Sequence, residues 1–152
     1  MDKKSKYQQA ETEIRRVLDG CKDEMVVMAT IPAILKHSFP YYFWVGFYRV
    51  VADDLLAIGP YQGTLGCLEI PFSKGVCGHC ATTKQTVIVP DVHEFPGHIA
   101  CDSKSQSEIV VSMFNKDSEL IAVFDVDSTE RNSFDEVGQQ GLEVIMELFA
   151  EI

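Results

Sequence analysis

The chain has 152 residues, which leaves room for one domain of ordinary size and excludes a second. Hydrophobic residues make up 46% of the sequence and charged residues 24%, a balance that supports a buried core and excludes wholesale disorder. Acidic side chains outnumber basic ones by 23 to 13, and the formal net charge is -10. This charge repels phosphate backbones and anionic lipids, so we expect neither nucleic acid nor a membrane surface as a partner.

The start of the chain and the cysteines indicate a cytoplasmic protein. The first lysines are followed by no apolar segment of the kind found in secretory signals. The longest aromatic and aliphatic run, Tyr41 to Tyr48, is too short to span a bilayer. Five cysteines are an odd number at modest density, so we expect reduced thiols rather than a structural disulfide framework.

Helical spacing dominates the start of the chain. Ile14, Val17, Leu18 and Cys21 repeat at the intervals of one helix face. A second apolar stretch, from Met25 to Leu35, predicts another helix directly afterwards.

Short aromatic and aliphatic runs between turn signals predict an antiparallel sheet in the middle of the chain. These runs are Phe43–Val50, Leu55–Ile58, Cys67–Ile70, Thr86–Val89, Glu108–Phe114 and Glu119–Asp127. Gly59 and Pro60 are expected to begin a loop after the second run, and a short helix is expected over Gly75–Thr83. The loop from Asp91 to Gln106 is long for a compact domain, and we interpret it as the active-site segment.

The end of the chain predicts one further helix. Ser133 with Glu136 three residues later forms a capping box, and apolar residues from Phe134 to Ile152 give that helix a buried stripe. Helices and an antiparallel sheet together define an α+β fold. We expect one domain over residues 1–152, with N-terminal helices in 1–38, the sheet and active-site loop in 42–127, and the C-terminal helix in 133–152.

Two interpretations of the cysteines compete. Cys77-Gly78-His79-Cys80 has the spacing of a dithiol redox centre, but such a centre belongs after a strand in a βαβ unit, and antiparallel hairpins surround this one. Cys80 is therefore interpreted as a small buried core residue. A zinc site is the other alternative, because Cys77, Cys80, His93, His98 and Cys101 are suitable ligands, although their spacing matches no known structural zinc pattern.

A group of carboxylates is the second chemical feature. Asp125 and Asp127 lie two residues apart, so they project from one face of a strand about 7 Å apart. Glu108 can join them across the last hairpin, although a strand end entering solvent explains the pair equally well. Trp44 lies in an aromatic strand, and by itself that position favours the core.

Several segments of the chain match a known family. They are Gly59-Pro60-Tyr61-Gln62-Gly63, Ile70-Pro71-Phe72, Gly75-Val76-Cys77-Gly78, Val89-Pro90-Asp91-Val92-His93, Phe95-Pro96-Gly97-His98-Ile99-Ala100-Cys101-Asp102-Ser103, Ser107-Glu108-Ile109-Val110-Val111 and Asp125-Val126-Asp127-Ser128. The phrase from Phe95 to Ser103 is too long and too unusual in composition to arise from strand and turn propensity. From about Trp44 to the final helix, the chain resembles the free methionine-(R)-sulfoxide reductases, a family built on the GAF fold.

The resemblance implies a GAF-type antiparallel sheet sandwiched by helices, and reduction of free methionine sulfoxide to methionine. By motif position Cys101 resembles the nucleophile, Cys67 the resolving thiol and Cys77 a third cysteine that assists or substitutes in resolution. Glu108, Asp125, Asp127 and Trp44 then match residues that line the substrate pocket. Cys80 departs from the family pattern, and it leaves open which thiol resolves the oxidised nucleophile.

Turnover in such an enzyme proceeds through a Cys101 sulfenic acid, an intramolecular disulfide and exchange with an external dithiol such as thioredoxin, without a metal or organic cofactor. A non-catalytic GAF domain that senses a small molecule or redox state is the alternative. A thiol pair at disulfide distance beside the carboxylates would favour the enzyme. The sequence leaves the oligomeric state open, with a homodimer as one possibility.

Overall fold

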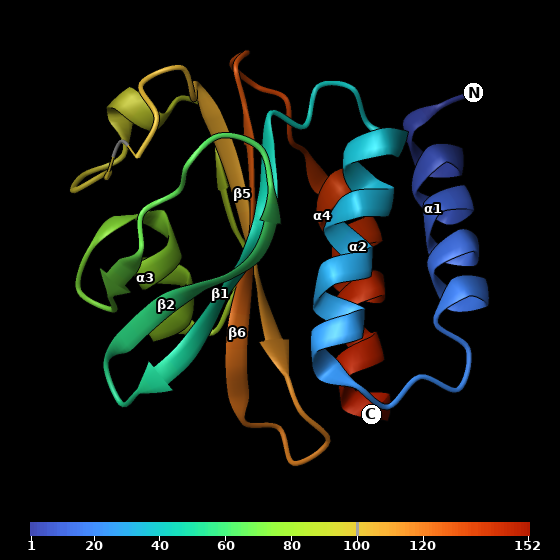
Figure 1. Cartoon of the computed structure of the whole chain (residues 1–152). Helices are drawn as coiled ribbons and strands as arrows, with labels where there is room; N and C mark the ends of the chain where they lie inside the picture. Colours follow the sequence, from blue (N-terminus) through green and yellow to red (C-terminus); the bar gives the residue numbers. More distant parts are fainter. Residues whose placement is uncertain (100) are drawn as a thin grey trace.

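The computed structural model describes residues 1–99 and 101–152. A six-stranded antiparallel sheet, in the order β3-β2-β1-β6-β5-β4, forms the middle layer of the molecule. Figure 1 shows α2 and α4 on one side of this sheet with α1 outside them, and α3 on the opposite side. The predicted α+β fold, a single domain with helices on both faces of the sheet, is confirmed.

The helices are α1 (Lys3–Val17), α2 (Glu24–Ser38), α3 (Gly75–Thr83) and α4 (Glu136–Met146), with short 3-10 turns at Val92–Glu94 and Glu147–Glu151. The strands are β1 (Trp44–Ala52), β2 (Leu55–Gln62), β3 (Glu69–Pro71), β4 (Val87–Val89), β5 (Ser107–Phe114) and β6 (Leu120–Ser128). None of the helices in the part of the chain that the structure describes is long and apolar enough to cross a membrane.

The alternation of side chains along the strands divides the core in two. Phe47, Phe124 and Val111 face the layer of α2 and α4, where they join one apolar cluster. Tyr48 and Val123, on the opposite face of the same strands, join a second cluster under α3. Because both faces are covered, polar side chains on the α3 face are also removed from bulk water.

Strand β2 continues beyond the predicted loop start at Gly59 and Pro60. It runs to Gln62, and its pairing with β1 slips between Gly46 and Tyr48. The slip is a β-bulge, and a Cβ on Gly46 would lie only 2.2 Å from Cβ of Tyr61. Because of the bulge, Gly59 and Pro60 fit within β2, and the strand continues to Gln62 instead of ending at a turn.

Three local predictions are wrong. Val17 is 49% exposed rather than on the buried face of α1. The third strand begins at Glu69, so Cys67 lies in the preceding loop. Helix α4 begins at Glu136 with Asp135 as its cap, whose carboxylate accepts a hydrogen bond from the Gly138 N–H at 3.1 Å.

Ser133 has another role than the predicted capping box. Its hydroxyl donates to Ser128 Oγ at 2.6 Å and to the Glu130 carbonyl at 3.1 Å, which fixes the turn after β6. A cap needs a side-chain oxygen directed at the free N–H groups of the first helical turn, and here Asp135 provides it.

Candidate active site

Three central strands place the carboxylates in two adjacent rows. In the first row Asp127 of β6 lies between Trp44 of β1 and Glu108 of β5. In the second row Asp125 lies between Gly46 and Val110. Because residues two apart share a face, all three acids are directed toward α3 rather than toward α2 and α4.

Glu108 and Asp125 are only 5% and 6% exposed, whereas Asp127 is partly open to the pocket. Asp125 Oδ1 accepts no hydrogen bond within the described part of the chain. The predicted grouping of the three acids is thus present, and the alternative of a strand end in solvent is excluded. A buried carboxylate oxygen without a hydrogen-bond donor is suited to hold a charged ligand.

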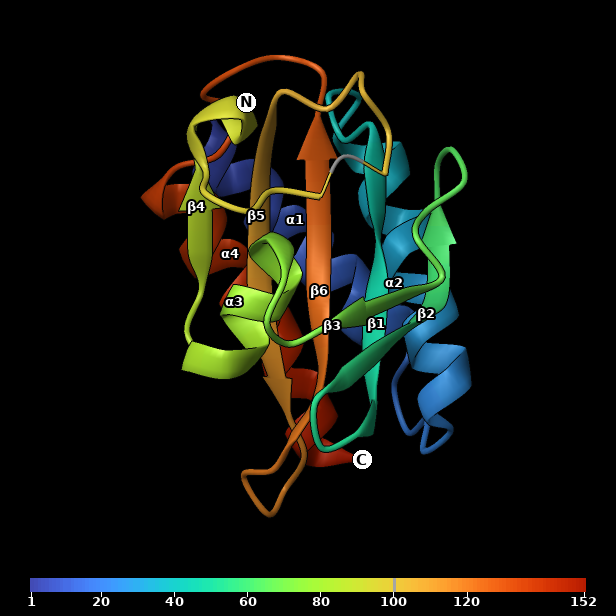
Figure 2. The same cartoon turned by 90° about the vertical axis from the view of Figure 1, so that its left-hand side faces the viewer.

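Two loops meet above this row of acids and are joined by a disulfide. Cys67, in the loop after β2, is bonded to Cys101, in the loop before β5, and their Cα atoms are 5.4 Å apart. The Thr64 hydroxyl also donates to Asp102 Oδ2 at 2.7 Å across the same two loops. Trp44 Nε1 donates to the Thr64 carbonyl at 2.8 Å, so the first loop is tied to the sheet as well. Figure 2 shows the two loops above the same end of β1, β6 and β5.

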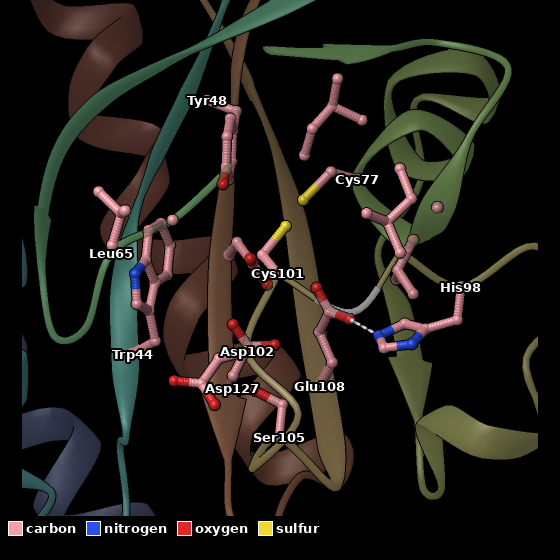
Figure 3. Close-up of a pocket in the computed structure, with 16 residues that line it drawn as sticks. Trp44, Tyr48, Leu65, Cys77, His98, Cys101, Asp102, Ser105, Glu108 and Asp127 are labelled. Atoms are coloured by element: carbon pink, nitrogen blue, oxygen red, sulfur yellow. Dashed lines mark ion pairs between the residues drawn. The ribbon is translucent and has the colours of Figure 1, made fainter. Parts of the chain in front are cut away.

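Helix α3 contributes a further thiol from the opposite side. It begins at Gly75, whose φ of 69° is in the left-handed region that favours glycine, and the Gly75 N–H donates to the Gly97 carbonyl at 3.2 Å. A Cβ on Gly78 would lie 2.6 Å from the Pro71 carbonyl oxygen, so the helix packs closely on the chain after β3. This packing leaves the Cys77 side chain in the pocket, and in Figure 3 its sulfur is directed toward that of Cys101.

The resulting pocket is a narrow cavity of about 40 Å³. Its polar wall consists of Glu108, Asp125 and Asp127, with Cys77 and Cys101 beside them. The lining also contains Trp44, Tyr48, Leu65, Gly66, Ile70, Gly75, Val76, His98, Ile99, Asp102 and Ser105. One wall is therefore apolar and aromatic and the other acidic, an arrangement suited to a small amphipathic ligand.

Trp44 belongs to the pocket as well as to the apolar cluster under α3. Its ring stacks on Tyr61 at 5.0 Å and on Tyr48 at 5.8 Å between centroids, and the residue is 4% exposed. The sequence alone favoured the core for this residue, and the structure shows that it also lines the cavity. The stack holds the indole edge in one position over the acids.

Burial raises the pKa of all three carboxyl groups. The pKa of Glu108 and that of Asp127 lie well above their usual range, because burial removes water and the negative charge of Asp125 opposes their ionisation. Burial raises the pKa of Asp125 as well, but the neighbouring side chains of Glu108, Asp127 and Cys77 partly offset this rise. Burial therefore favours the protonated form of all three carboxyls, with opposing contributions from neighbouring side chains at Asp125.

Two further titratable groups of the pocket, Cys77 and His98, favour their neutral forms. Burial and the nearby Asp125 charge raise the pKa of the Cys77 thiol well above its usual range. Burial lowers the pKa of His98, whose Nε2 lies 3.7 Å from Glu108 Oε1. A neutral imidazole beside a protonated carboxyl fits these two directions.

For Cys80, the structure favours the interpretation as a buried core residue over that as part of a dithiol redox centre. Cys80 is buried, and its thiol hydrogen-bonds to Ser112 Oγ at 3.2 Å and to the Val110 carbonyl at 3.5 Å, as a core residue would. Burial raises its pKa to about 12, so it is a poor nucleophile. Cys77 and Cys80 are both free thiols, and no disulfide joins them.

The five zinc ligands considered from the sequence do not converge. His93 is exposed and bonded to Asp91 at 2.9 Å, and Cys101 is in the disulfide. Within residues 1–99 and 101–152, the one group of potential metal donors is Cys77 with Glu108 and Asp125, whose ligand atoms lie within 4.8 Å of one another.

Sequence reasoning missed some residues of the site. Tyr48 lies four residues after Trp44 on the same strand, so the period of two could have placed it on the pocket face. The hydrogen bond between Thr64 and Asp102 joins residues 38 apart in two irregular loops, and no local sequence pattern predicts it.

Comparison with known proteins agrees with this geometry. The family model for the GAF domain matches residues 12–152. A protein of Escherichia coli named free methionine-R-sulfoxide reductase is 37% identical over 142 residues, which cover 93% of this chain and 85% of that protein. A protein of the same name from Saccharomyces cerevisiae is 46% identical over 107 residues, covering 69% of this chain and 59% of that protein.

A solved structure extends the similarity to three dimensions. The X-ray structure of free methionine-R-sulfoxide reductase from Neisseria meningitidis in complex with its substrate has a TM-score of 0.94 and 39% identity, and the match covers 99% of this chain and 90% of that one. The chain therefore belongs to the GAF domain family and, within it, to the free methionine-R-sulfoxide reductases.

The raised pKa of Glu108 gives a prediction about stability. Between the ordinary glutamate pKa of about 4.3 and the raised one, the folded protein binds more protons than the unfolded chain, so its free energy of unfolding falls as pH rises. The slope reaches about 1.4 kcal/mol per pH unit for one proton. Glu108→Gln removes this proton uptake, so the variant should gain stability relative to the wild type as pH rises above about 5.

Urea denaturation at pH 5, 6 and 7 measures this difference. Glu69→Gln, at an exposed position of β3, serves as the matched control and should differ from the wild type by a constant amount. If the stability difference between Glu108→Gln and the wild type does not change with pH, the inferred protonation of Glu108 is wrong.

Proposed function

We propose that the protein reduces free L-methionine-(R)-sulfoxide to L-methionine, with Cys101 as nucleophile and Cys67 as resolving thiol. One observation carries the assignment: the Cys67–Cys101 disulfide lies over a pocket whose wall is a row of buried carboxyls. A thiol pair that forms a disulfide supplies the two electrons of the reduction. The acids supply the proton that the sulfoxide oxygen requires.

The chemistry begins at the sulfoxide sulfur. The Cys101 thiolate attacks, the oxygen is transferred to Cys101 as sulfenic acid, and methionine leaves. The Cys67 thiol then condenses with the sulfenic acid, which releases water and forms the disulfide. The sulfoxide and two thiols are thus converted to methionine, one disulfide and one water. Cys77, on the other side of the pocket, is our candidate for substituting in the second step.

Proton donation falls to a carboxyl that is protonated near neutral pH. The raised pKa of Glu108 and of Asp127 makes both suitable donors to the sulfoxide oxygen. Asp125, whose rise in pKa is partly offset, is the best candidate for the carboxylate that holds the substrate ammonium. We assign the indole of Trp44 to the substrate methyl group, because it supplies an aromatic surface in the pocket directly beside Asp127.

The sensor alternative has less support. A binding module that takes up a small molecule needs no pair of thiols in bonding position beside its pocket. The 5.4 Å between the Cα atoms of Cys67 and Cys101 lies within the usual range for a disulfide, as the enzyme requires.

We further propose that a thioredoxin-type dithiol in the cytoplasm reduces the disulfide. Leu65 and Leu68, on either side of Cys67, are 75% and 67% exposed, which is unusual for leucines placed so close together. Exposed apolar residues around a disulfide are suited to bind the surface that surrounds the partner's attacking cysteine. Cys21, Cys77 and Cys80 are free thiols, as expected in a reducing compartment.

Cysteine variants test the roles of the thiols. Cys101→Ser should form no methionine, because the nucleophile is missing. The double variant Cys67→Ser/Cys77→Ser should form about one methionine per chain and then stall, since nothing within the protein resolves the sulfenic acid. The measurement is methionine released by each protein with the thioredoxin system present. Continued turnover by Cys101→Ser would mean that another thiol is the nucleophile.

The substrate amine gives the second prediction. N-acetylation removes the positive charge that we pair with Asp125, and an unpaired desolvated carboxylate is strongly unfavourable. The kcat/KM for N-acetylmethionine-(R)-sulfoxide should therefore be lower than for the free amino acid by about 10⁴ or more. Steady-state assays of the free substrate, its S epimer and the acetyl derivative make the comparison. Similar kcat/KM values for the free and acetylated compounds would refute our assignment of the acids to the amine.

Leu68 tests the docking of the reductant, because it does not line the substrate pocket. Leu68→Ser should raise the KM for thioredoxin several-fold through lost apolar contact, while the rate with dithiothreitol stays unchanged. Val51→Ser, at another exposed aliphatic position on β1, is the matched control and should leave both rates unchanged. Equal KM values for thioredoxin in all three proteins would place the docking surface elsewhere.

A further inference from the structure

We propose that the pocket also binds one zinc ion, held by Cys77, Glu108 and Asp125, and that the ion is a reversible inhibitor rather than a cofactor. Zinc combines thiolate, carboxylate and imidazole ligands readily, whereas magnesium and calcium prefer oxygen alone. The site is a mixed set of one sulfur and two carboxyls, which favours a borderline-soft divalent cation.

The geometry of the donors supports the site. The candidate ligand atoms of the three residues all lie within 4.8 Å of one another, and all three residues are buried. Tetrahedral zinc, with bonds of about 2.3 Å to sulfur and about 2.0 Å to oxygen, places neighbouring ligands about 3.3 to 3.6 Å apart. The ligand atoms that lie 4.8 Å apart would therefore have to approach by about 1.2 to 1.5 Å, which side-chain rotation can supply.

A second observation points to a cationic ligand independently of the cluster. Asp125 Oδ1 is buried and has no hydrogen-bond partner among the described residues. Such an oxygen is unfavourable unless a cation or a donor occupies the space before it. An ion between Asp125, Glu108 and Cys77 would satisfy this oxygen.

His98 is placed to supply a fourth ligand. Its Nε2 lies 3.7 Å from Glu108 Oε1, on the side of the pocket away from Trp44. Imidazole nitrogen is one of the usual ligands of zinc. Gly75, with its φ of 69°, lies against Ile99 next to His98, so the start of α3 and this loop are held together.

Neither Cys67 nor Cys101 is needed for the site. The ion can therefore bind while their disulfide is intact, which separates this site from any metal bound by the reduced pair. Inhibition follows because the ion would occupy the acids that we assign to the substrate ammonium. That part rests on the proposed function, whereas binding of the ion does not.

The binding test uses cadmium as a spectroscopic substitute for zinc, on protein with the Cys67–Cys101 disulfide intact. We expect one cadmium per chain, a thiolate-to-cadmium absorption band in the ultraviolet, and loss of the band when zinc is added. Cys77→Ser should abolish the band, and Asp125→Asn should weaken binding at least tenfold while keeping the band at saturation. Cys21→Ser and Cys80→Ala, which remove the other free thiols, are the matched controls and should bind like the wild type.

A band that persists in Cys77→Ser, or that disappears in Cys21→Ser or Cys80→Ala, would overturn the proposed site. Asp125→Asn keeps the thiol and nearly the same shape, so unchanged affinity in that variant would also overturn it.

Equilibrium dialysis with free methionine sulfoxide tests the inhibition separately. Substrate should weaken cadmium binding to the Cys67→Ser/Cys101→Ser protein, which lacks the disulfide and keeps Cys77. Cadmium binding through Cys77 that substrate does not weaken would confirm the ion site and contradict the inhibition, and with it the assignment of the acids to the amine.

Discussion

The site depends on the burial of three carboxyl groups on one face of a sheet. Burial is unfavourable for ionised acids, and strand pairing alone keeps these three together: Asp127 is held between Trp44 and Glu108 by the register of β1, β6 and β5. A slip of one residue in β6 would turn Asp125 and Asp127 toward the apolar layer of α2 and α4. The large apolar residues on that other face, such as Phe47 and Phe124, therefore fix the chemistry as well as the fold.

Close packing and cross-links hold helix α3 and the two loops in position around the three acids. Gly75 and Gly78 let α3 approach closely, which places the Cys77 thiol against the acids. From the opposite side, the bond from Thr64 to Asp102 and the disulfide hold two irregular loops over the pocket. The loops alone would be mobile, and cross-links between them are what define a cavity in this state.

Much of this could be read from the sequence, because the period of a strand is simple. Asp125 and Asp127 share a face by their spacing, and Glu108 joins them as soon as the last two strands are paired as a hairpin. The boundaries were harder to predict where tertiary contacts override local signals. Strand β2 passes through Gly59 and Pro60 because a bulge between the Gly46–Tyr61 and Tyr48–Ile58 pairs accommodates them.

The pocket itself could be placed only by resemblance. Cys67, Cys101 and Cys77 come from three separate segments, and no periodicity relates a loop cysteine to one on a helix. The prediction of Ser133 as the cap of α4 was wrong for a related reason. The Ser133 hydroxyl is hydrogen-bonded to Ser128, whose position depends on the end of β6. Long-range partners decide such cases, and they are not encoded in the neighbouring residues.

The same burial explains how the work is divided between the thiols. Among the buried acids a thiolate is disfavoured, and the pKa of Cys77, which is 4% exposed, is raised accordingly. Cys101 is instead on an exposed part of its loop, where water can stabilise the thiolate, yet it still lines the pocket. The mechanism that we propose needs protonated carboxyls and an ionised thiol in one site, and the structure places these groups at different depths. The carboxyls are on the buried face of the sheet, and Cys101 is on an exposed loop.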